Sequence, residues 1–200
     1  MPKAKKSVRR PARKRSSGTR SAAARDAIAL LKQDHQQVKG WFEEFLSARA
    51  DGRKQDLAER ICQALKVHTE IEHEIFYPAF LEATGDEDIH HEAEVEHDSA
   101  KKLIAEIERS GPQDDYFDAR VKVLSEMIQH HVNEEEKRDG MFARARQSAM
   151  DLRSLGEQLA ERKAQLMGGK PGTRDEQPSS RSSRTSQSRG KQDLRSTVRQ

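Results

Sequence analysis

The sequence HTEIEHEIFYP, from His68 to Pro78, places the glutamate Glu72 four residues after the histidine His68. The sequence HHVNEEE, from His130 to Glu136, repeats this spacing with His131 and Glu135. Residues four apart lie on one face of an α-helix, about 6 Å apart along its axis at ~1.5 Å rise per residue. Both pairs occupy positions that the surrounding apolar pattern assigns to a buried face. Two helices are therefore predicted to direct an imidazole and a carboxylate into a protein interior.

The flanking sequence extends this pattern to four segments in which apolar residues recur at alternating spacings of three and four. Such spacing is typical of amphipathic helices that share a core. The expected helices run over about residues 26–50, 54–81, 87–109 and 114–147. Gly52 is expected to cap the first helix, and Thr84-Gly85-Asp86 and Ser110-Gly111-Pro112 are expected to end the second and third. With no strand-like alternation, the sequence predicts an all-α, up-down-up-down four-helix bundle.

Each of the four segments carries one histidine where its period calls for an apolar residue. Burying imidazoles and two carboxylates without partners would cost several kcal/mol, and the carboxylates would repel each other. Cations placed between these groups remove both penalties, and neutral imidazole and ionised carboxylate are ligands that suit iron, manganese or zinc. The predicted metal ligands are His35, His68, Glu72, His97, His131 and Glu135.

The other four histidines do not share this position. His73 and His130 are rotated about 100° from the ligand face at 3.6 residues per turn, and His91 is also displaced from it. His90 lies about 10.5 Å before His97 along the helix, too far to share a metal with it. These four are interpreted as supporting or solvated side chains.

Charge divides the chain into an acidic middle and two basic ends. Residues 1–25 hold ten Lys/Arg and no Asp/Glu, and residues 168–200 hold eight Lys/Arg and three Asp/Glu, whereas residues 26–167 carry a net charge of −12. We expect disordered tails at 1–25 and 168–200, because neither can bury enough apolar area to offset its ordering entropy. The bundle is expected over 26–147, and residues 148–167 are expected to form a fifth helix or to continue the fourth.

The composition also limits the class of protein. No window of about 18 apolar residues could span a membrane, and the start of the chain has no apolar signal-peptide core, so a cytoplasmic protein is expected. A single cysteine, Cys62, excludes an intrachain disulfide framework. The basic tails are interpreted as solubilising segments or as segments that bind nucleic-acid phosphate in a salt-sensitive way. The N-terminal tail is alternatively interpreted as an organelle transit peptide.

With these motifs the chain resembles the bacterial hemerythrin-like, or HHE, cation-binding domain. The resemblance covers about residues 27–144 and rests on Asp34-His35, HTEIEHEIFYP, Glu96-His97 and HHVNEEE. It implies two non-haem irons joined by a solvent oxo or hydroxo bridge, with manganese or zinc as alternatives. In this assignment the four histidines of the set are terminal ligands, and Glu72 and Glu135 bridge the two metals.

The chain also departs from the oxygen-carrying hemerythrins, which use five histidines. Ala93 and Lys101 stand where a second histidine of the third helix would be expected. Two histidines per metal leave more open positions, which favours turnover over reversible carriage. The resemblance therefore implies binding or turnover of O2, peroxide or NO, or alternatively an iron or oxygen sensor brought to nucleic acid by its tails.

Two other metal sites fit the sequence less well. A ferritin-like site needs Glu-x-x-His on two helices and a glutamate from each of the other two, and Glu70-x-x-His73 and Glu94-x-x-His97 have this spacing. Glu70 and His73 lie off the apolar face, however, and no glutamate replaces His35 on the first helix. A zinc hydrolase of the HExxH type is excluded, because Val95 stands where its second histidine would be. Tyr77 is expected mainly to pack in the core, with a hydrogen bond near Glu72 as the alternative.

Overall fold

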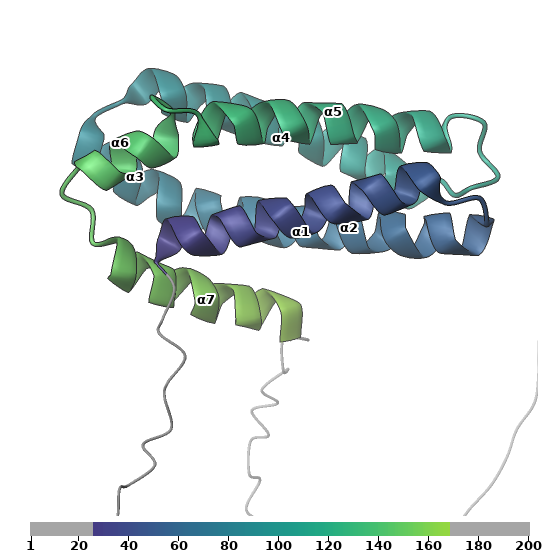
Figure 1. The fold of residues 1–200 in the computed structure, drawn as a ribbon, viewed down its shortest axis with the longest axis horizontal. Helices are drawn as coiled ribbons and strands as arrows, with labels where there is room; N and C mark the ends of the chain where they lie inside the picture. The colour runs from purple at the N-terminus through teal and green to yellow at the C-terminus, as the bar shows by residue number, and fades with distance from the viewer. Residues whose placement is uncertain (1–25, 169–200) are drawn as a thin grey trace, which may run out of the picture. The chain divides into compact units, whose positions relative to one another are not determined.

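The computed structural model describes residues 26–168, and within this range the chain is helical without strands (Figure 1). The elements are α1 (Ala27–Ser47), α2 (Asp51–Ile71), the π-helix η1 (Glu72–Phe76), α3 (Tyr77–Thr84), α4 (Glu87–Arg109), α5 (Phe117–Glu136), α6 (Met141–Gln147) and α7 (Leu152–Gly168). The predicted tails lie outside the described residues, except that Gly168 ends α7. None of the described helices combines the length and apolar character that crossing a membrane requires.

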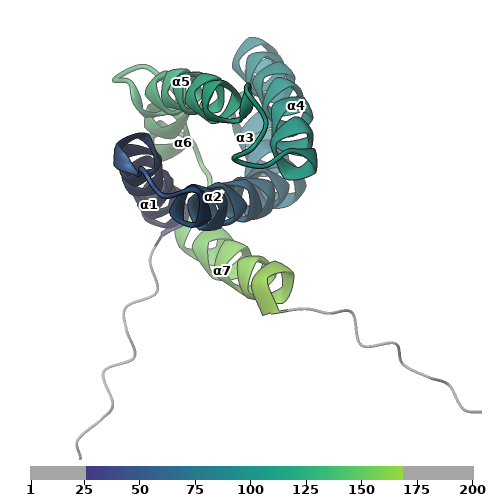
Figure 2. The same cartoon turned by 90° about the vertical axis from the view of Figure 1, so that its right-hand side faces the viewer.

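Four long helices form the bundle, as predicted. Seen end-on in Figure 2, α1, α2, α4 and α5 surround a common centre, and each contacts the helix before and after it in this cycle. Successive helices are joined at alternate ends, which is the up-down-up-down topology. The predicted third helix, Glu87–Arg109, agrees with α4 at both ends.

The junction between the first two helices corrects one expectation. Asp26 caps α1 by accepting a hydrogen bond from the Ala29 N–H at 2.7 Å. The helix ends when Ala48 becomes extended, and α2 begins only three residues later at Asp51. Gly52 therefore lies inside α2, and its predicted role as a cap of the first helix is wrong. The left-handed glycine that does end a helix is Gly85, with φ 66° after α3.

The second predicted helix contains a π-turn. Residues 51–84 stay helical throughout, but η1 interrupts the α-helical register between α2 and α3. Pro78 is the second residue after the π-helix, at a position where the ring of a proline would crowd the carbonyl of Glu74 in a regular α-helix. Glu72 is the first residue of η1, so the local change of register also determines where this carboxylate points.

The fourth predicted helix, residues 114–147, is broken. α5 ends at Glu136, Lys137 turns the chain with ψ 163°, and α6 begins at Met141. Gly140 closes this turn so tightly that a Cβ atom there would lie 2.2 Å from the carbonyl oxygen of Glu134. Only glycine fits at that distance. The apolar spacing continues across this turn, so it concealed the break.

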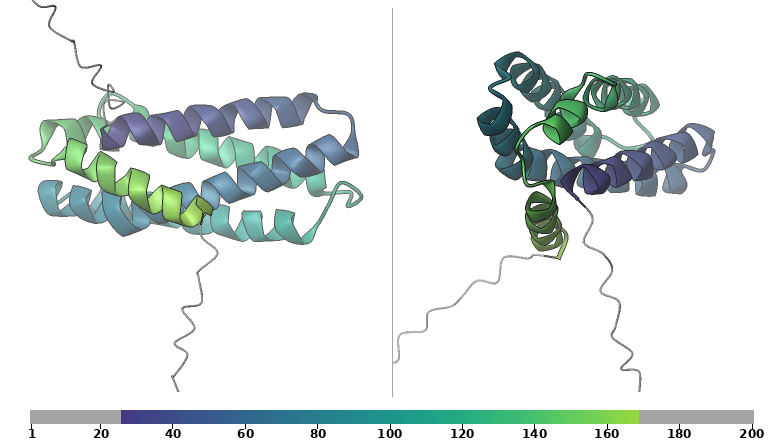
Figure 3. Two further views of the ribbon diagram at one scale, coloured as in Figure 1. Left: turned by 90° about the horizontal axis from the view of Figure 1, so that it is seen from below. Right: turned by 60° about the vertical axis from the view of Figure 1, so that its left-hand side comes forward.

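α7 is a separate fifth helix and lies along α1 and α2 outside the bundle (Figure 3). Leu159 is fully buried, and Leu152, Leu155 and Leu166 pack against the same core. The core has two apolar clusters. One is built around Phe42, Phe45, Leu57, Ile61, Leu65, Ile104, Phe117 and Leu124, and the other around Ile28, Leu31, Ile71, Phe76, Phe80, Met141 and Phe142. The predicted metal ligands belong to neither cluster and fall between them along α1, α4 and α5.

Candidate metal centre

The structure brings all six predicted ligands together in the bundle interior. They come from α1, α2, η1, α4 and α5, and each is at most 6% exposed. The residues are His35, His68, Glu72, His97, His131 and Glu135. Within the described residues, five of the six supply two groups of donor atoms that could hold a metal ion: His35, His68 and Glu72 form one, and Glu72, His97 and His131 form the other, whereas Glu135 belongs to neither. That these groups bind metal stays a prediction.

The first half of the site joins α1 to α2. The Nε2 atoms of His35 and His68 are 3.1 Å apart. Glu72 Oε2 lies 3.2 Å from His68 Nε2, and Glu135 Oε2 lies 3.4 Å from His35 Nε2. Two imidazole nitrogens and two carboxylate oxygens thus face one point.

The second half joins α4 to α5 and has the same composition. The Nε2 atoms of His97 and His131 are again 3.1 Å apart. Glu72 Oε2 lies 3.5 Å from His97 Nε2, and Glu135 Oε1 lies 3.7 Å from His131 Nε2. Both carboxylates therefore contact both halves, and Glu135 does so with a different oxygen for each.

These spacings fit a metal ion better than they fit a network of hydrogen bonds. Two nitrogens bound at about 2.1 Å to one ion, at right angles, are about 3.0 Å apart. Both oxygens of Glu72 and Oε2 of Glu135 are buried and have no hydrogen-bond donor. Buried carboxylate oxygens without donors are costly, and a cation bound between them removes that cost.

Carboxylates outside the predicted ligand set hydrogen-bond two of the four imidazoles. His35 Nδ1 donates to Glu136 Oε1 at 2.8 Å, and His131 Nδ1 donates to Glu96 Oε2 at 2.7 Å. An ionised carboxylate can only accept, so the proton sits on Nδ1 and Nε2 is left to face the centre. The pKa of Glu136 is lowered, chiefly by the hydrogen bond from His35. This arrangement orients imidazoles as metal-binding proteins commonly do.

The imidazole of His68 lies near Asp34, a carboxylate that α7 contacts. Asp34 is 7% exposed, and its Oδ2 lies 3.6 Å from His68 Nδ1. The other oxygen of Asp34 forms an ion pair with Lys163 of α7. Arg162, next along α7, binds Glu74 of η1 through two hydrogen bonds of 2.5 and 2.8 Å. α7 therefore contacts both the carboxylate beside His68 and the π-turn that carries Glu72.

Tyr77 supplies the remaining polar contact. Its hydroxyl donates to Glu135 Oε1 at 3.2 Å and lies 3.1 Å from His97 Nε2. The expected core packing of Tyr77 is confirmed, and its hydroxyl also makes a hydrogen bond at the centre, with Glu135 as the acceptor. Burial, together with the charges of the two carboxylates, raises the pKa of Tyr77 well above its usual value, so the hydroxyl keeps its proton.

Without a cation, protons balance the charge of the centre. Burial and the neighbouring Glu72 raise the pKa of Glu135 to about 8. Burial also opposes ionisation of Glu72, but the positive charge of His68, whose Nε2 lies 3.2 Å away, outweighs it and lowers the pKa of Glu72 to about 2. Burial likewise opposes protonation of His68, yet Glu72 and Asp34 raise its pKa to about 10. Binding a metal must therefore displace protons from these groups.

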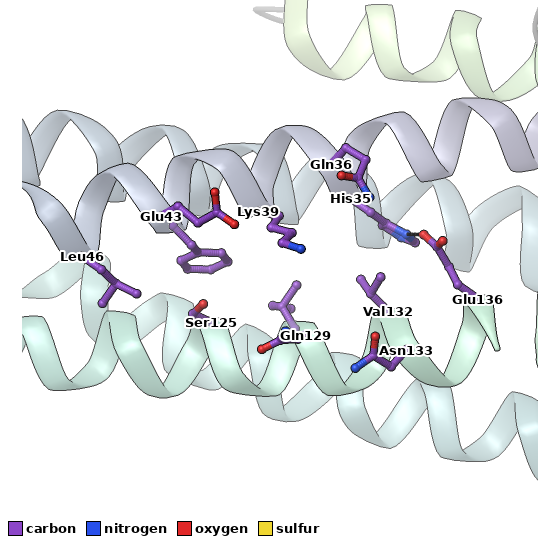
Figure 4. Close-up of a pocket in the computed structure, with 12 residues that line it drawn as sticks. His35, Gln36, Lys39, Glu43, Leu46, Ser125, Gln129, Val132, Asn133 and Glu136 are labelled. Carbon is purple, nitrogen blue, oxygen red and sulfur yellow. Dashed lines mark hydrogen bonds and ion pairs between the residues drawn. The ribbon is translucent and has the colours of Figure 1, made fainter.

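A pocket of about 290 Å³ approaches the centre between α1 and α5 (Figure 4). His35 and Glu136 line its inner end, and Lys39 extends its ammonium group into the space between the helices. A narrow inner cavity of about 10 Å³ lies among the four ligand histidines. His35, Ile128 and Val132 line both spaces. These three residues therefore separate the outer pocket from the centre.

The histidines predicted to lie off the ligand face stay outside it. His73 Nδ1 lies 2.9 Å from Glu94 on the surface, and His130 lies 3.4 Å from Glu96. The ferritin-like alternative fails at the same point, because Glu94 interacts with exposed His73 rather than with the core. His90 packs edge-on against Tyr77.

Three residues that lie against the predicted ligands were given no role from the sequence: Asp34, Glu96 and Glu136. Each is adjacent in sequence to a predicted ligand, which was an available signal. The sequence does not show which side chain each of these carboxylates contacts. Glu96 precedes His97 but binds His131 of the next helix, and Glu136 follows Glu135 but binds His35 of α1.

Comparisons with known proteins identify the family and the fold of the chain. The sequence profile of the hemerythrin HHE cation-binding domain matches residues 26–143. A crystal structure of a hemerythrin HHE cation-binding domain-containing protein from Mycobacterium kansasii superposes with a TM-score of 0.62 at 24% identity, over 72% of this chain and 88% of that one, which shows a shared fold. A DNA nickase of Nostoc sp. is 28% identical over 107 residues; the match covers 54% of this chain but only 30% of that protein. Since the profile covers more than half of its length, the chain belongs to the hemerythrin HHE cation-binding family.

Proposed function

We propose that the protein binds two non-haem irons in the bundle core and uses them to bind or turn over O2, peroxide or NO. The observation that carries this proposal is the paired arrangement of donors. Each half of the site has two Nε2 atoms 3.1 Å apart, and Glu72 and Glu135 contact both halves. Manganese or zinc would find the same donors, so iron rests on the family.

The small number of protein donors per metal favours turnover of a small ligand over its reversible carriage. Two imidazoles and two shared carboxylates offer each metal fewer protein donors than a six-coordinate ion accepts, which leaves positions for an external ligand. When bound, the iron pair would supply the electron transfer. Tyr77 holds a proton at the centre, on a hydroxyl 3.2 Å from Glu135. The narrow cavity beyond Ile128 and Val132 has room for about one water-sized group, so it admits only small ligands.

Multiple-turnover kinetics would test the proposal. Iron-loaded protein should consume peroxide or NO well beyond one equivalent per chain, with an optical spectrum that changes on each addition. Glu72→Ala should lose both iron and turnover, because it removes the carboxylate common to both halves. The control Glu82→Ala changes an exposed glutamate of α3 and should retain both. Wild-type protein that binds no metal would refute the proposal.

The second candidate is an iron or oxygen sensor that reaches nucleic acid through its basic tails. Two observations favour it: the net positive charge of residues 1–25 and 168–200, and the similarity to a protein named as a DNA nickase. Stoichiometric ligand binding without turnover would support the sensor. Retention on duplex DNA should fall with rising salt and disappear when both tails are removed; retention that survives truncation would refute the role of the tails. The cytoplasmic location expected from the sequence stays part of either proposal.

A further inference from the structure

A second, smaller pocket reaches the opposite half of the centre. Its volume is about 40 Å³, and it lies between α4, α5 and the turn that leads into α6. Glu92 and Lys137 are exposed at its outer side, whereas His131 and Glu135, both lining it, are at most 4% exposed. The pocket therefore connects solvent with the donors of the α4–α5 half.

Carboxylates dominate the charged groups that line this pocket, beside the apolar Ile89, Ala93 and Met141. Glu92, Glu96, Glu134 and Glu135 face it, and Lys137 is its single cation, paired with Glu134 at the mouth. The pocket between α1 and α5 differs, because Lys39, Glu43 and Glu136 give it a mixed lining and Glu136 is already bound by Lys32 and His35. The two approaches to the centre thus differ in charge.

The innermost carboxylate of the acidic pocket has one oxygen without a hydrogen-bond donor. Glu135 is 2% exposed, and its Oε2 has no hydrogen-bond partner. Glu96, one step further out, already holds His131 and is fixed by that bond at 2.7 Å. A row of acids that ends in an unsatisfied buried oxygen attracts a positive charge inward.

We propose that this acidic pocket is the entrance through which a partly hydrated divalent cation reaches the metal centre. The inference rests on the proposed metal-binding function and adds the route by which the metal arrives. A site of about 40 Å³ has room for roughly three water-sized groups, at 10–15 Å³ each. The incoming cation takes the place of the Lys137 ammonium beside Glu134, passes Glu96, and meets Glu135 and His131.

Such a route predicts that surface charge controls the rate of loading but not its extent. Focused electrostatic attraction raises association rates by roughly 10- to 1,000-fold, and it weakens as ionic strength rises. Removing two charges at the mouth leaves the six donors in place. The final amount of bound metal should therefore stay the same while uptake slows.

The test is stopped-flow uptake of Fe2+ alone, under anaerobic conditions, by the full-length metal-free protein. The double variant Glu92→Gln/Glu134→Gln should load about tenfold more slowly than wild type and reach the same metal content. Lys137→Met should load faster than wild type. The matched control Glu108→Gln/Glu126→Gln removes two exposed acids from the same two helices, one paired with Lys66 and the other with Lys122, and should load within twofold of wild type.

The outcomes separate the entrance from the function. Equal loading rates in the pocket variant and wild type, or equal slowing in the control, would overturn the entrance while leaving metal binding intact. A wild-type protein that takes up no Fe2+ would overturn the proposed function itself. Slower loading restricted to the pocket variant, with weakening of the difference at high salt, is the result that the proposal expects.

Discussion

Replacing Tyr77 by phenylalanine tests whether the polar contacts at the centre stabilise the fold. The ring of Tyr77 is fully buried, so Tyr77→Phe keeps its packing and removes only the hydroxyl. The hydroxyl donates to Glu135 Oε1 at 3.2 Å, and that oxygen then has only His131 nearby, at 3.7 Å. Losing one buried hydrogen bond and leaving its acceptor unsatisfied costs about 1.5 kcal/mol. With an unfolding entropy of about 2.1 cal/mol/K per residue over the helical region, Tm should fall by about 5 °C.

The measurement is urea and thermal unfolding of the metal-free protein, followed by circular dichroism. Tyr116→Phe is the matched control, because Tyr116 is 68% exposed and should change the free energy of unfolding by less than about 0.5 kcal/mol. After iron loading, the effect of Tyr77→Phe should shrink, because the metal then satisfies Glu135. A Tyr77→Phe protein as stable as the control in the metal-free state would refute the reasoning.

Three further changes test other parts of the account. Gly140→Ala should destabilise the fold by about 3 kcal/mol in urea unfolding, since its Cβ would lie 2.2 Å from a backbone oxygen, whereas Gly40→Ala in the open interior of α1 should stabilise it by about 0.5–1 kcal/mol. Lys163→Met should lose iron to a chelator about tenfold faster than Arg162→Met, because only Lys163 holds the carboxylate beside a ligand histidine; equal rates would exclude this role. The pKa of Glu135 is raised to about 8 in the metal-free fold, so the fold keeps a proton that the unfolded chain releases above about pH 4.5. The stability of the metal-free fold should therefore fall as pH rises from about 4.5 to 8, and metal binding should expel this proton. Unbuffered Zn2+ titration at pH 7 should therefore release about one proton fewer from Glu135→Gln than from wild type, and equal release would contradict this assignment.

The bundle and the position of the six donors were predictable because helical periodicity alone determines which residues share a face. His97 recurs with Ala93 and Ala100 on the buried side of α4, so its burial follows from spacing. The same periodicity cannot show where a helix breaks without loss of apolar register. The turn after Glu136 requires glycine at position 140, where a Cβ atom would meet the carbonyl oxygen of Glu134, and hydropathy does not record this close backbone approach.

The second layer of the site was beyond prediction for a different reason. Whether Glu96 reaches His97 or His131 depends on the relative rotation of α4 and α5, which sequence spacing within one helix does not contain. The link from Lys163 to Asp34 depends on α7 docking against α1, between residues that are 129 positions apart. These contacts arise from packing between helices and become visible only in three dimensions.

The most direct test of the account is a crystal structure of the iron-loaded protein with anomalous scattering measured at the iron edge. We expect two peaks about 3.5–4 Å apart, as in two-metal sites generally. One should lie within bonding distance of the Nε2 atoms of His35 and His68, and the other within bonding distance of those of His97 and His131. A single peak, or iron bound away from these four nitrogens, would contradict the claim that the bundle holds a dinuclear centre.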